Sequence, residues 1–182
     1  MQSPIILPWK GVRPTIAADT FIAPNATVIG DVHIGARSSL WFNVVVRGDV
    51  NHIRIGARTN IQDGTIVHTS SLPQHPTLIG DDVLVGHAAV IHACVLESGC
   101  FIGMSATVMD GAVVESGAMV AAGALVGPGK RVPKGQLWAG MPARFMRAMT
   151  PDEIASLPKQ IAHYAALADS YRAIVAQESA VP

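Results

Sequence analysis

Aliphatic side chains recur at every sixth position over most of the chain, and this period limits the folds that the sequence can adopt. A helical face needs spacings of three and four residues, and a half-buried strand alternates every second residue, so neither explains a period of six. The period fits a short strand followed by a tight corner, repeated so that three faces complete one coil of a triangular prism. The inward-pointing positions are then Ile16, Ile22, Val28, Ile34, Leu40, Val46, Ile55, Ile61, Val67, Ile79, Val85, Ile91, Leu96, Ile102, Val108, Val114, Val120, Val126 and Val132. We therefore predict a mainly β fold, a parallel β-helix with about 18 residues per coil and coils about 4.8 Å apart.

Two insertions interrupt the period. The first fits a loop around residues 47–51, and the second fits a loop within residues 69–76. Insertions in a repeat fold map to loops, and loops are where binding and catalytic sites are commonly built.

The period also divides the chain into four segments. We expect an N-terminal arm at 1–14, the β-helix at 15–137, an irregular exit at 138–149, and a C-terminal helix with its tail at 150–182.

The final helix has a start signal of its own. Thr150 and Glu153 have the spacing of a capping box, and Pro151 suits the first helical position. Apolar residues follow at helical spacing, namely Ile154, Leu157, Ile161, Tyr164, Ala168, Tyr171 and Val175. One face of this helix should pack along the prism and cover sheet edges. Pro158 is expected to break or restart the helix.

The composition is neutral and apolar. Among 182 residues, 13 basic side chains balance 13 acidic ones, which argues against a nucleic-acid binder or a basic membrane-surface protein. Hydrophobic residues make up 49%, charged residues 14%, and the mean hydropathy is +0.36. No apolar run reaches the roughly 18 residues of a membrane span. Because a chain this apolar would otherwise expose much apolar surface to water, we expect other subunits to cover part of it.

The expected location is the cytoplasm. The first ten residues lack the basic start, apolar core and cleavage site of an export signal. Cys94 and Cys100 are too few for a disulfide scaffold and lie in an apolar region, so we expect buried free thiols.

Three of the seven histidines have related positions when residues are counted by coil. His68 and His92 each follow an inward position one coil apart, so they should be stacked neighbours that point outward from the same face. His87 leaves the preceding face; it should not reach that pair in its own chain, but it could reach the pair of a neighbouring subunit. Three imidazoles with an open position describe a catalytic zinc site.

The repeat resembles the hexapeptide-repeat proteins, which form left-handed parallel β-helices. Within them, the sequence is similar to the γ-class carbonic anhydrases and their bacterial relatives. The residues that carry this resemblance are Arg47, Asp49, Asn60, Gln62, Asp63, His68, His87 and His92. The resemblance implies a homotrimer in which His68, His87 and His92 bind Zn²⁺, or in some cases Fe²⁺ or Co²⁺, at subunit interfaces. It also implies a small-molecule substrate, carbon dioxide, that is hydrated to bicarbonate by hydroxide formed at the metal.

The same resemblance assigns roles to neighbouring residues. Gln62 would orient the hydroxide or the substrate by hydrogen bonding. Arg47 and Asp49 would join subunits across the interface and line the site. Asp63 would support the site from outside or at the interface, and Asn60 would either contact substrate or stack in a turn.

A further residue of the resemblance lies in the final helix. Tyr164 matches a tyrosine that some relatives direct toward the metal, although an ordinary role in helix packing explains it as well.

The sequence also departs from the family pattern. The archetypal enzyme carries glutamates in both loops, one of them its proton shuttle, whereas the corresponding places here hold Val50 and the stretch around Ser70 and Ser71. His75 of the second loop is the alternative proton shuttle. Fast carbon dioxide hydration is therefore less firmly predicted than metal binding.

Three other functions stay open at this point. A hexapeptide-repeat acyltransferase would use one histidine as a base and leave the other two unexplained. An acyl-CoA thioesterase would use the same metal site on another substrate. A metal-binding assembly subunit would keep the fold with weak or absent turnover.

Overall fold

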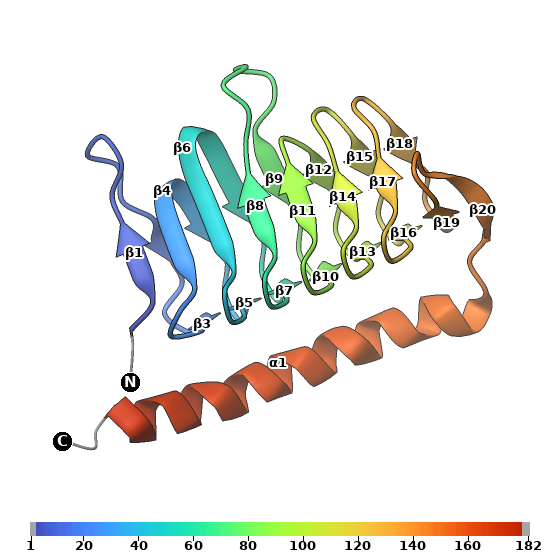
Figure 1. Cartoon of the computed structure of the whole chain (residues 1–182). Coiled ribbons are helices and arrows are strands. Elements are labelled where there is room, and N and C mark those ends of the chain that lie inside the picture. The colour runs from blue at the N-terminus through green and yellow to red at the C-terminus, as the bar shows by residue number, and fades with distance from the viewer. Residues whose placement is uncertain (1–2, 180–182) are drawn as a thin grey trace.

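The computed structural model describes residues 3–179, and its strands wind into a parallel β-helix, which confirms the predicted fold class (Figure 1). A 12-stranded sheet covers two faces of the prism because β4 (Thr27–Ile34) and β6 (Val45–Ile55) continue from one face to the next. Its other strands are β1 (Ile5–Leu7), β2 (Thr15–Ile16), β8 (Ile66–His68), β9 (Thr77–Ile79), β11 (Val90–His92), β12 (Val95–Leu96), β14 (Thr107–Val108), β15 (Val113–Val114), β17 (Leu125–Val126) and β18 (Arg131–Val132).

An 8-stranded sheet forms the third face. Its strands are β3 (Phe21–Ile22), β5 (Ser39–Leu40), β7 (Asn60–Ile61), β10 (Leu84–Val85), β13 (Phe101–Ile102), β16 (Met119–Val120), β19 (Gln136–Ala139) and β20 (Arg144–Ala148). We call the part of the large sheet formed by β8, β11, β14, β17 and the first halves of β4 and β6 the histidine face, because it carries His68 and His92.

The interior of the prism is filled by the six-residue ladder. Every ladder side chain from Val28 to Val132 is buried. Ile16 and Ile22 are only partly buried, because the first coil has a neighbouring coil on one side alone. Buried alanines two positions before ladder residues fit the narrow corners, namely Ala106, Ala112, Ala118 and Ala124. The hydrophobic period therefore sets both the coil height and the core.

The N-terminal arm expected at 1–14 is not a free arm over its described part. Strand β1 pairs with β4 in parallel register, with Ile6 opposite Val28, so it adds a rung to the histidine face. The chain then turns back through an antiparallel bridge between Trp9 and Val12. Ile6 therefore continues the inward ladder one position before Ile16, where the sequence pattern begins.

The exit expected to be irregular at 138–149 is a hairpin. Strand β20 returns antiparallel to β19, and Trp138 of β19 continues the ladder opposite Val120. The hairpin places β20 beside the last parallel rung of the 8-stranded sheet, where β19 would otherwise be an edge with unpaired backbone groups.

The C-terminal helix α1 (Pro151–Ser179) begins at the predicted capping box and runs without a break. The amide of Thr150 donates to the Glu153 carboxylate at 2.8 Å, and the Glu153 amide donates to Thr150 Oγ1 at 3.2 Å. The expectation that Pro158 breaks the helix was wrong. Pro158 and Ile154 are exposed, so water can reach the Ile154 carbonyl that the proline leaves without a helical donor.

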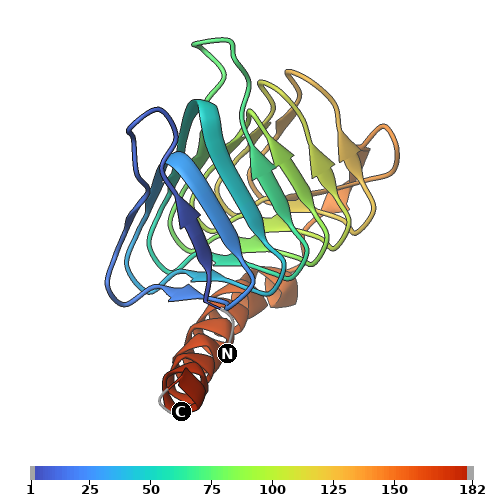
Figure 2. The ribbon, with the colours of Figure 1, turned by 60° about the vertical axis from the view of Figure 1, so that its left-hand side comes forward.

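Helix α1 lies along the outside of the 8-stranded sheet, as the two views of the ribbon show (Figures 1 and 2). Its main anchor is aromatic: the Tyr171 ring packs edge-on against Trp41 with centroids 5.1 Å apart, and Phe21 and Phe42 flank it. Leu157, Ile161 and Ala168 are the buried residues of the helix. The helix thus covers the third face and leaves the histidine face uncovered in the single chain.

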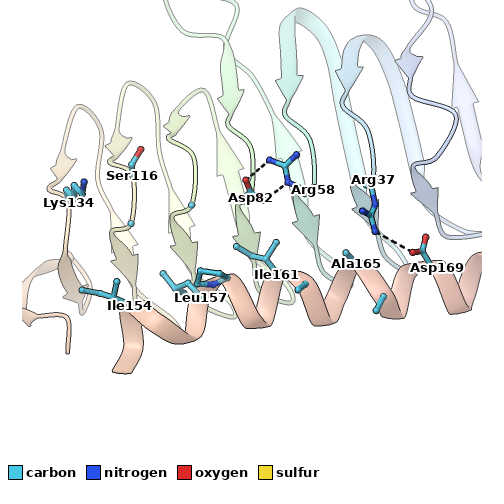
Figure 3. Close-up of a pocket in the computed structure, with 15 residues that line it drawn as sticks. Arg37, Arg58, Asp82, Ser116, Lys134, Ile154, Leu157, Ile161, Ala165 and Asp169 are labelled. Carbon is cyan, nitrogen blue, oxygen red and sulfur yellow. Dashed lines mark hydrogen bonds and ion pairs between the residues drawn. The ribbon is translucent and has the colours of Figure 1, made fainter. Parts of the chain in front are cut away.

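A groove of about 700 Å³ separates part of α1 from a corner of the prism (Figure 3). The helix contributes Leu157, Ile161 and Ala165, and the prism contributes Arg58, whose guanidinium pairs with Asp82 at 2.6 and 2.7 Å. None of the predicted site residues lines this groove, so it is separate from the candidate site.

Within residues 3–179, the structure has no helix with the length and apolar character required to cross a membrane.

Candidate metal centre

Two histidines lie directly opposite each other on the histidine face. The register of β8 and β11 pairs His68 with His92, because Val67 and Ile91 occupy the same inward position in consecutive coils. The Nδ1 atom of His68 lies 3.2 Å from Nε2 of His92, and the two rings are tilted by 51°. Their side chains are 19% and 34% exposed, so the pair is half-buried but open on one side.

The outer nitrogen of each of these imidazoles faces a carboxylate. Nε2 of His68 lies 3.0 Å from Oδ1 of Asp49, and Nδ1 of His92 lies 2.6 Å from Oδ1 of Asp110. A carboxylate accepts a hydrogen bond, so each outer nitrogen carries a proton, and in a neutral imidazole this is the only ring N–H. The two inner nitrogens, which face each other, are then both left with lone pairs.

This arrangement fits a bound cation. Two lone pairs 3.2 Å apart repel unless a proton or a metal ion lies between them. Two nitrogens bound to one zinc ion at about 2.0–2.1 Å and at a tetrahedral angle lie roughly 3.4 Å apart. The residues present therefore suit a divalent metal with imidazole ligands, and carboxylates behind metal-binding imidazoles are a common supporting arrangement.

His87 lies at the corner between β10 and β11. Its Nδ1 atom is 2.8 Å from Oδ2 of Asp63, which leaves Nε2 free, and its side chain is 45% exposed. Within residues 3–179 of the single chain, no three histidine, cysteine or acidic side chains converge on one point. His87 therefore carries the same imidazole–carboxylate pairing as the other two histidines, but it does not converge with them in the single chain.

Arg47 and Asp49 form an ion pair within the chain, with NH1 of Arg47 2.6 Å from Oδ2 of Asp49. Both residues belong to β6, and Arg47 lies beside His68 in the register of β6 with β8. Burial raises the pKa of Asp49, but hydrogen bonds from His68 and Arg47 outweigh it and bring the pKa below its ordinary value. Asp49 is thus held as the anion between a cation and an imidazole.

Gln62 and Asn60 are both nearly fully buried in or beside β7, but they have different surroundings. Gln62 lies at the corner after β7, next to Asp63 and therefore near the His87 position. Asn60 lies on the 8-stranded sheet, where its Nδ2 donates to Ser39 Oγ at 2.7 Å and its Oδ1 has no hydrogen-bond partner. The chain brings Gln62, but not Asn60, to the corner that holds His87.

Tyr164 does not lie with the histidines in the single chain. It is on α1, where its ring packs edge-on against Trp41 with centroids 6.2 Å apart and against His163 at 5.6 Å. Its predicted role toward the metal stays a prediction.

His75 lies at the end of the second insertion. Its carbonyl accepts hydrogen bonds from Thr69 Oγ1 and from the Ser70 amide, which close the loop. The ring packs so close to Gly111 that a Cβ there would meet it at 3.6 Å, and its buried Nδ1 has no hydrogen-bond partner. His75 therefore lies beside Gly111, the residue that follows Asp110.

The sequence reasoning missed Asp110. A usable signal was present: Ile91 is paired with Val108, so Asp110, two residues after Val108, lies in the coil next to His92. The sequence predictions rested on the histidines and on the family motif, and Asp110 belongs to neither.

Comparisons with known proteins agree with the fold. The model described as bacterial transferase hexapeptide (six repeats) matches residues 13–48. The crystal structure of a hexapeptide transferase family protein from Anaplasma phagocytophilum is 48% identical, with a TM-score of 0.88 over 92% of this chain and 98% of that one. Hence the fold is shared nearly end to end with a solved structure.

Two relatives identify the family within this fold. The "Probable carbonic anhydrase" of Methanocaldococcus jannaschii is 51% identical over 155 residues, which cover 85% of this chain and 96% of the relative. Mitochondrial γ carbonic anhydrase 1 of Arabidopsis thaliana is 50% identical over 164 residues and 88% of this chain. The matched part spans 60% of the length of that plant protein. The chain therefore belongs to the γ-class carbonic anhydrase family.

Proposed function

We propose that the protein is a metal-dependent carbonic anhydrase that hydrates carbon dioxide reversibly to bicarbonate, at sites shared between the subunits of a homotrimer. The observation that carries this proposal is the pair of facing nitrogens of His68 and His92, 3.2 Å apart, each with a carboxylate behind it. This arrangement suits a metal cation, and the relatives that share the family are named for the reaction.

The third ligand is proposed to come from another subunit. His87 has the same carboxylate support as the other two histidines, but it does not converge with them among the described residues of its own chain. A threefold assembly that brings the histidine face of one chain to the His87 corner of the next would complete three imidazoles with an open position. The uncovered apolar side chains of this face, Ile66 and Val90, favour such burial.

A divalent cation in such a site lowers the pKa of bound water to about 7 and so supplies hydroxide near neutral pH. We propose Zn²⁺, with Fe²⁺ or Co²⁺ as alternatives, because neutral imidazoles suit all three. The chain supplies the rest. The histidines would hold the cation without cancelling its charge, and hydrogen bonds from His68 and Arg47 keep Asp49 ionised behind His68. Gln62, at the corner of His87, is proposed to orient the substrate through its amide.

The chain has few side chains that could carry a proton away from the proposed site. Val50 is half-exposed, and Ser70 and Ser71 occupy the tip region of the second loop, so neither loop supplies a carboxylate at these positions. His75 is the nearest titratable candidate, since its ring lies against Gly111 beside Asp110. We therefore propose turnover that is slow in the absence of an external buffer and faster when a small buffer such as imidazole accepts the proton.

Acyl-group chemistry is the second candidate function. The structural neighbour from Anaplasma phagocytophilum bears the name of a transferase family, which favours an acyltransferase or an acyl-CoA thioesterase on the same fold. An acyltransferase needs one histidine base and leaves two carboxylate-supported imidazoles without a role. A cytoplasmic location stays a prediction, since the Arabidopsis relative is mitochondrial by name.

Stopped-flow hydration of carbon dioxide tests the proposal. The protein is purified without oxygen, stripped of metal, and supplied separately with zinc, iron or cobalt. We expect hydration that follows metal content and disappears in the His87→Ala variant. Equal hydration rates of the metal-free and metal-loaded proteins would overturn the proposal. So would a metal-loaded wild-type protein that is no faster than the His87→Ala variant. Acetyl-CoA hydrolysis and acetyl transfer are measured on the same samples. Hydrolysis would indicate a thioesterase, and transfer would indicate an acyltransferase.

A further inference from the structure

Each histidine of the proposed site is paired with an aspartate at a different place in the solenoid. His68 pairs with Asp49 from the preceding coil at 3.0 Å, and His87 pairs with Asp63 from the preceding coil at 2.8 Å. His92 pairs with Asp110 from the following coil at 2.6 Å, the shortest of the three contacts. The first two aspartates belong to the family resemblance, whereas Asp110 does not.

Most acidic residues at the corners of the prism have a backbone contact that Asp110 lacks. Five of them accept a hydrogen bond from a backbone amide of a neighbouring coil and so tie the coils together; they are Asp19, Asp63, Asp81, Glu97 and Glu115. Among the contacts of residues 3–179, the Asp110 carboxylate hydrogen-bonds only His92. Asp82 also bonds a side chain, but its partner is the Arg58 guanidinium and not an imidazole.

The backbone holds Asp110 firmly in place. Its carbonyl accepts from the Gly129 amide at 2.9 Å, and the next amide, that of Gly111, donates to the Ala93 carbonyl at 2.7 Å. These two bonds fix the corner to the coils on both sides. The Gly111 backbone has φ of +68°, which an L-residue adopts only with strain, and the His75 ring packs against it. Asp110 is thus preorganised relative to His92.

We propose that Asp110 is a positioning residue that keeps the proton of His92 on Nδ1 and the lone pair on Nε2, which faces His68. This inference rests on the proposed metal site, and it adds the residue that selects the binding nitrogen of one ligand. In the neutral imidazole only one nitrogen carries the proton, and a hydrogen bond to one nitrogen decides which. Without Asp110, the ring is free to take the other tautomer or to rotate away from the cation.

Two variants separate positioning from structure. Asp110→Ala removes the acceptor, whereas Asp110→Asn keeps an oxygen that can accept from Nδ1 and loses only the charge. The matched control is Asp82→Ala, which removes a corner carboxylate whose partner is Arg58 rather than a histidine. Subunit mass in solution and thermal unfolding of all four proteins show whether each variant assembles and folds.

Two readouts decide the proposal on assembled protein. The first is the ¹⁵N NMR spectrum of the metal-free protein with labelled histidine, where we expect the His92 ring as the Nδ1–H tautomer. This form should persist in Asp110→Asn and be lost in Asp110→Ala. The second is the zinc Kd, measured by competition with a chromophoric chelator. We expect a 10–100-fold weaker Kd for Asp110→Ala, an intermediate value for Asp110→Asn, and no change for Asp82→Ala.

The outcome is independent of the reaction that the protein catalyses. If carbon dioxide is not hydrated but both readouts change as expected, the proposed function fails and the role of Asp110 stands. If Asp110→Ala folds, keeps the wild-type tautomer and binds zinc within twofold of the wild type, Asp110 is a structural residue and the inference is wrong. If Asp110→Ala does not assemble, the tautomer and the Kd of Asp110→Asn decide alone: an unchanged Kd overturns the inference.

Discussion

Nδ1 of His68 lies 3.2 Å from Nε2 of His92, although the residues belong to different coils. Adjacent strands are about 4.8 Å apart, so two identical side chains in consecutive coils would keep their equivalent atoms at that distance. The rings are instead tilted by 51° and converge with unlike nitrogens. Asp49 and Asp110 hold the other nitrogens and so maintain this convergence.

Removal of one of these rings should abolish metal binding without unfolding the prism. In His92→Ala, one inner nitrogen is lost, whereas the buried neighbour Ile91 still fills the core. We expect the zinc Kd to weaken more than about 100-fold, the upper range for loss of a supporting residue. Zinc content by mass spectrometry and unfolding by urea check this, and a His92→Ala protein with one zinc ion per site would contradict it.

A substitution in the core should lower the stability of the protein and leave its zinc affinity unchanged. Ile102 is fully buried in the ladder of the 8-stranded sheet. Ile102→Ala should lower the free energy of unfolding by about 2–5 kcal/mol, because it removes apolar contacts and leaves a cavity. Denaturation at a fixed subunit concentration measures this change. Zinc affinity should stay at the wild-type value, and a loss of both would show that core and site are not independent.

Glu153 gives the start of α1 an acid-sensitive contact. Its hydrogen bonds with Arg147 and the Thr150 amide lower its pKa from 4.5 to about 2. Because the pKa is lower in the folded state, the stabilisation is complete above pH 4.5 and is lost as the pH falls toward 2. Glu153→Gln should therefore reduce the slope of Tm against pH in this window. An identical acid profile for variant and wild type would contradict the prediction.

The cysteines should be unreactive in the folded protein. Burial raises the pKa of Cys94 to about 12 and raises that of Cys100 as well, so neither forms the thiolate that reacts. With a thiol-specific chromogenic disulfide at pH 8, we expect no release from the native protein and two thiols per chain after denaturation in guanidinium. Rapid release from the native protein would show that these side chains are accessible.

Much of the fold follows from the sequence because one residue in six must fill a narrow prism, and that requirement shows directly as the aliphatic period. The stacking of His68 on His92 follows from the number of residues per coil, and the register of β8 and β11 confirms it. The hairpin of β19 and β20 was missed because it pairs through backbone groups, and its strand β20 carries mostly exposed side chains.

The details of the site depended on contacts that the period does not encode. The resemblance implied that Arg47 and Asp49 join subunits, whereas the structure pairs Asp49 with Arg47 of its own chain and with His68. Tyr164 was a candidate for the metal and also a member of the apolar face predicted for the helix, and the structure places it on that face, against Trp41. Side-chain direction on a long helix is set by packing across the whole face.

The shared site is the central claim, and mixed trimers test it most directly. Chains with His87→Ala and chains with His92→Ala are combined one to one, reassembled, and analysed for bound zinc. Each variant alone should hold no zinc, whereas a site between a His87→Ala chain and a His92→Ala chain can still gather three intact histidines. With random assembly of head-to-tail interfaces, about a quarter of the sites should recover zinc. Zinc content that stays at the level of the separate variants would contradict a site built from two subunits.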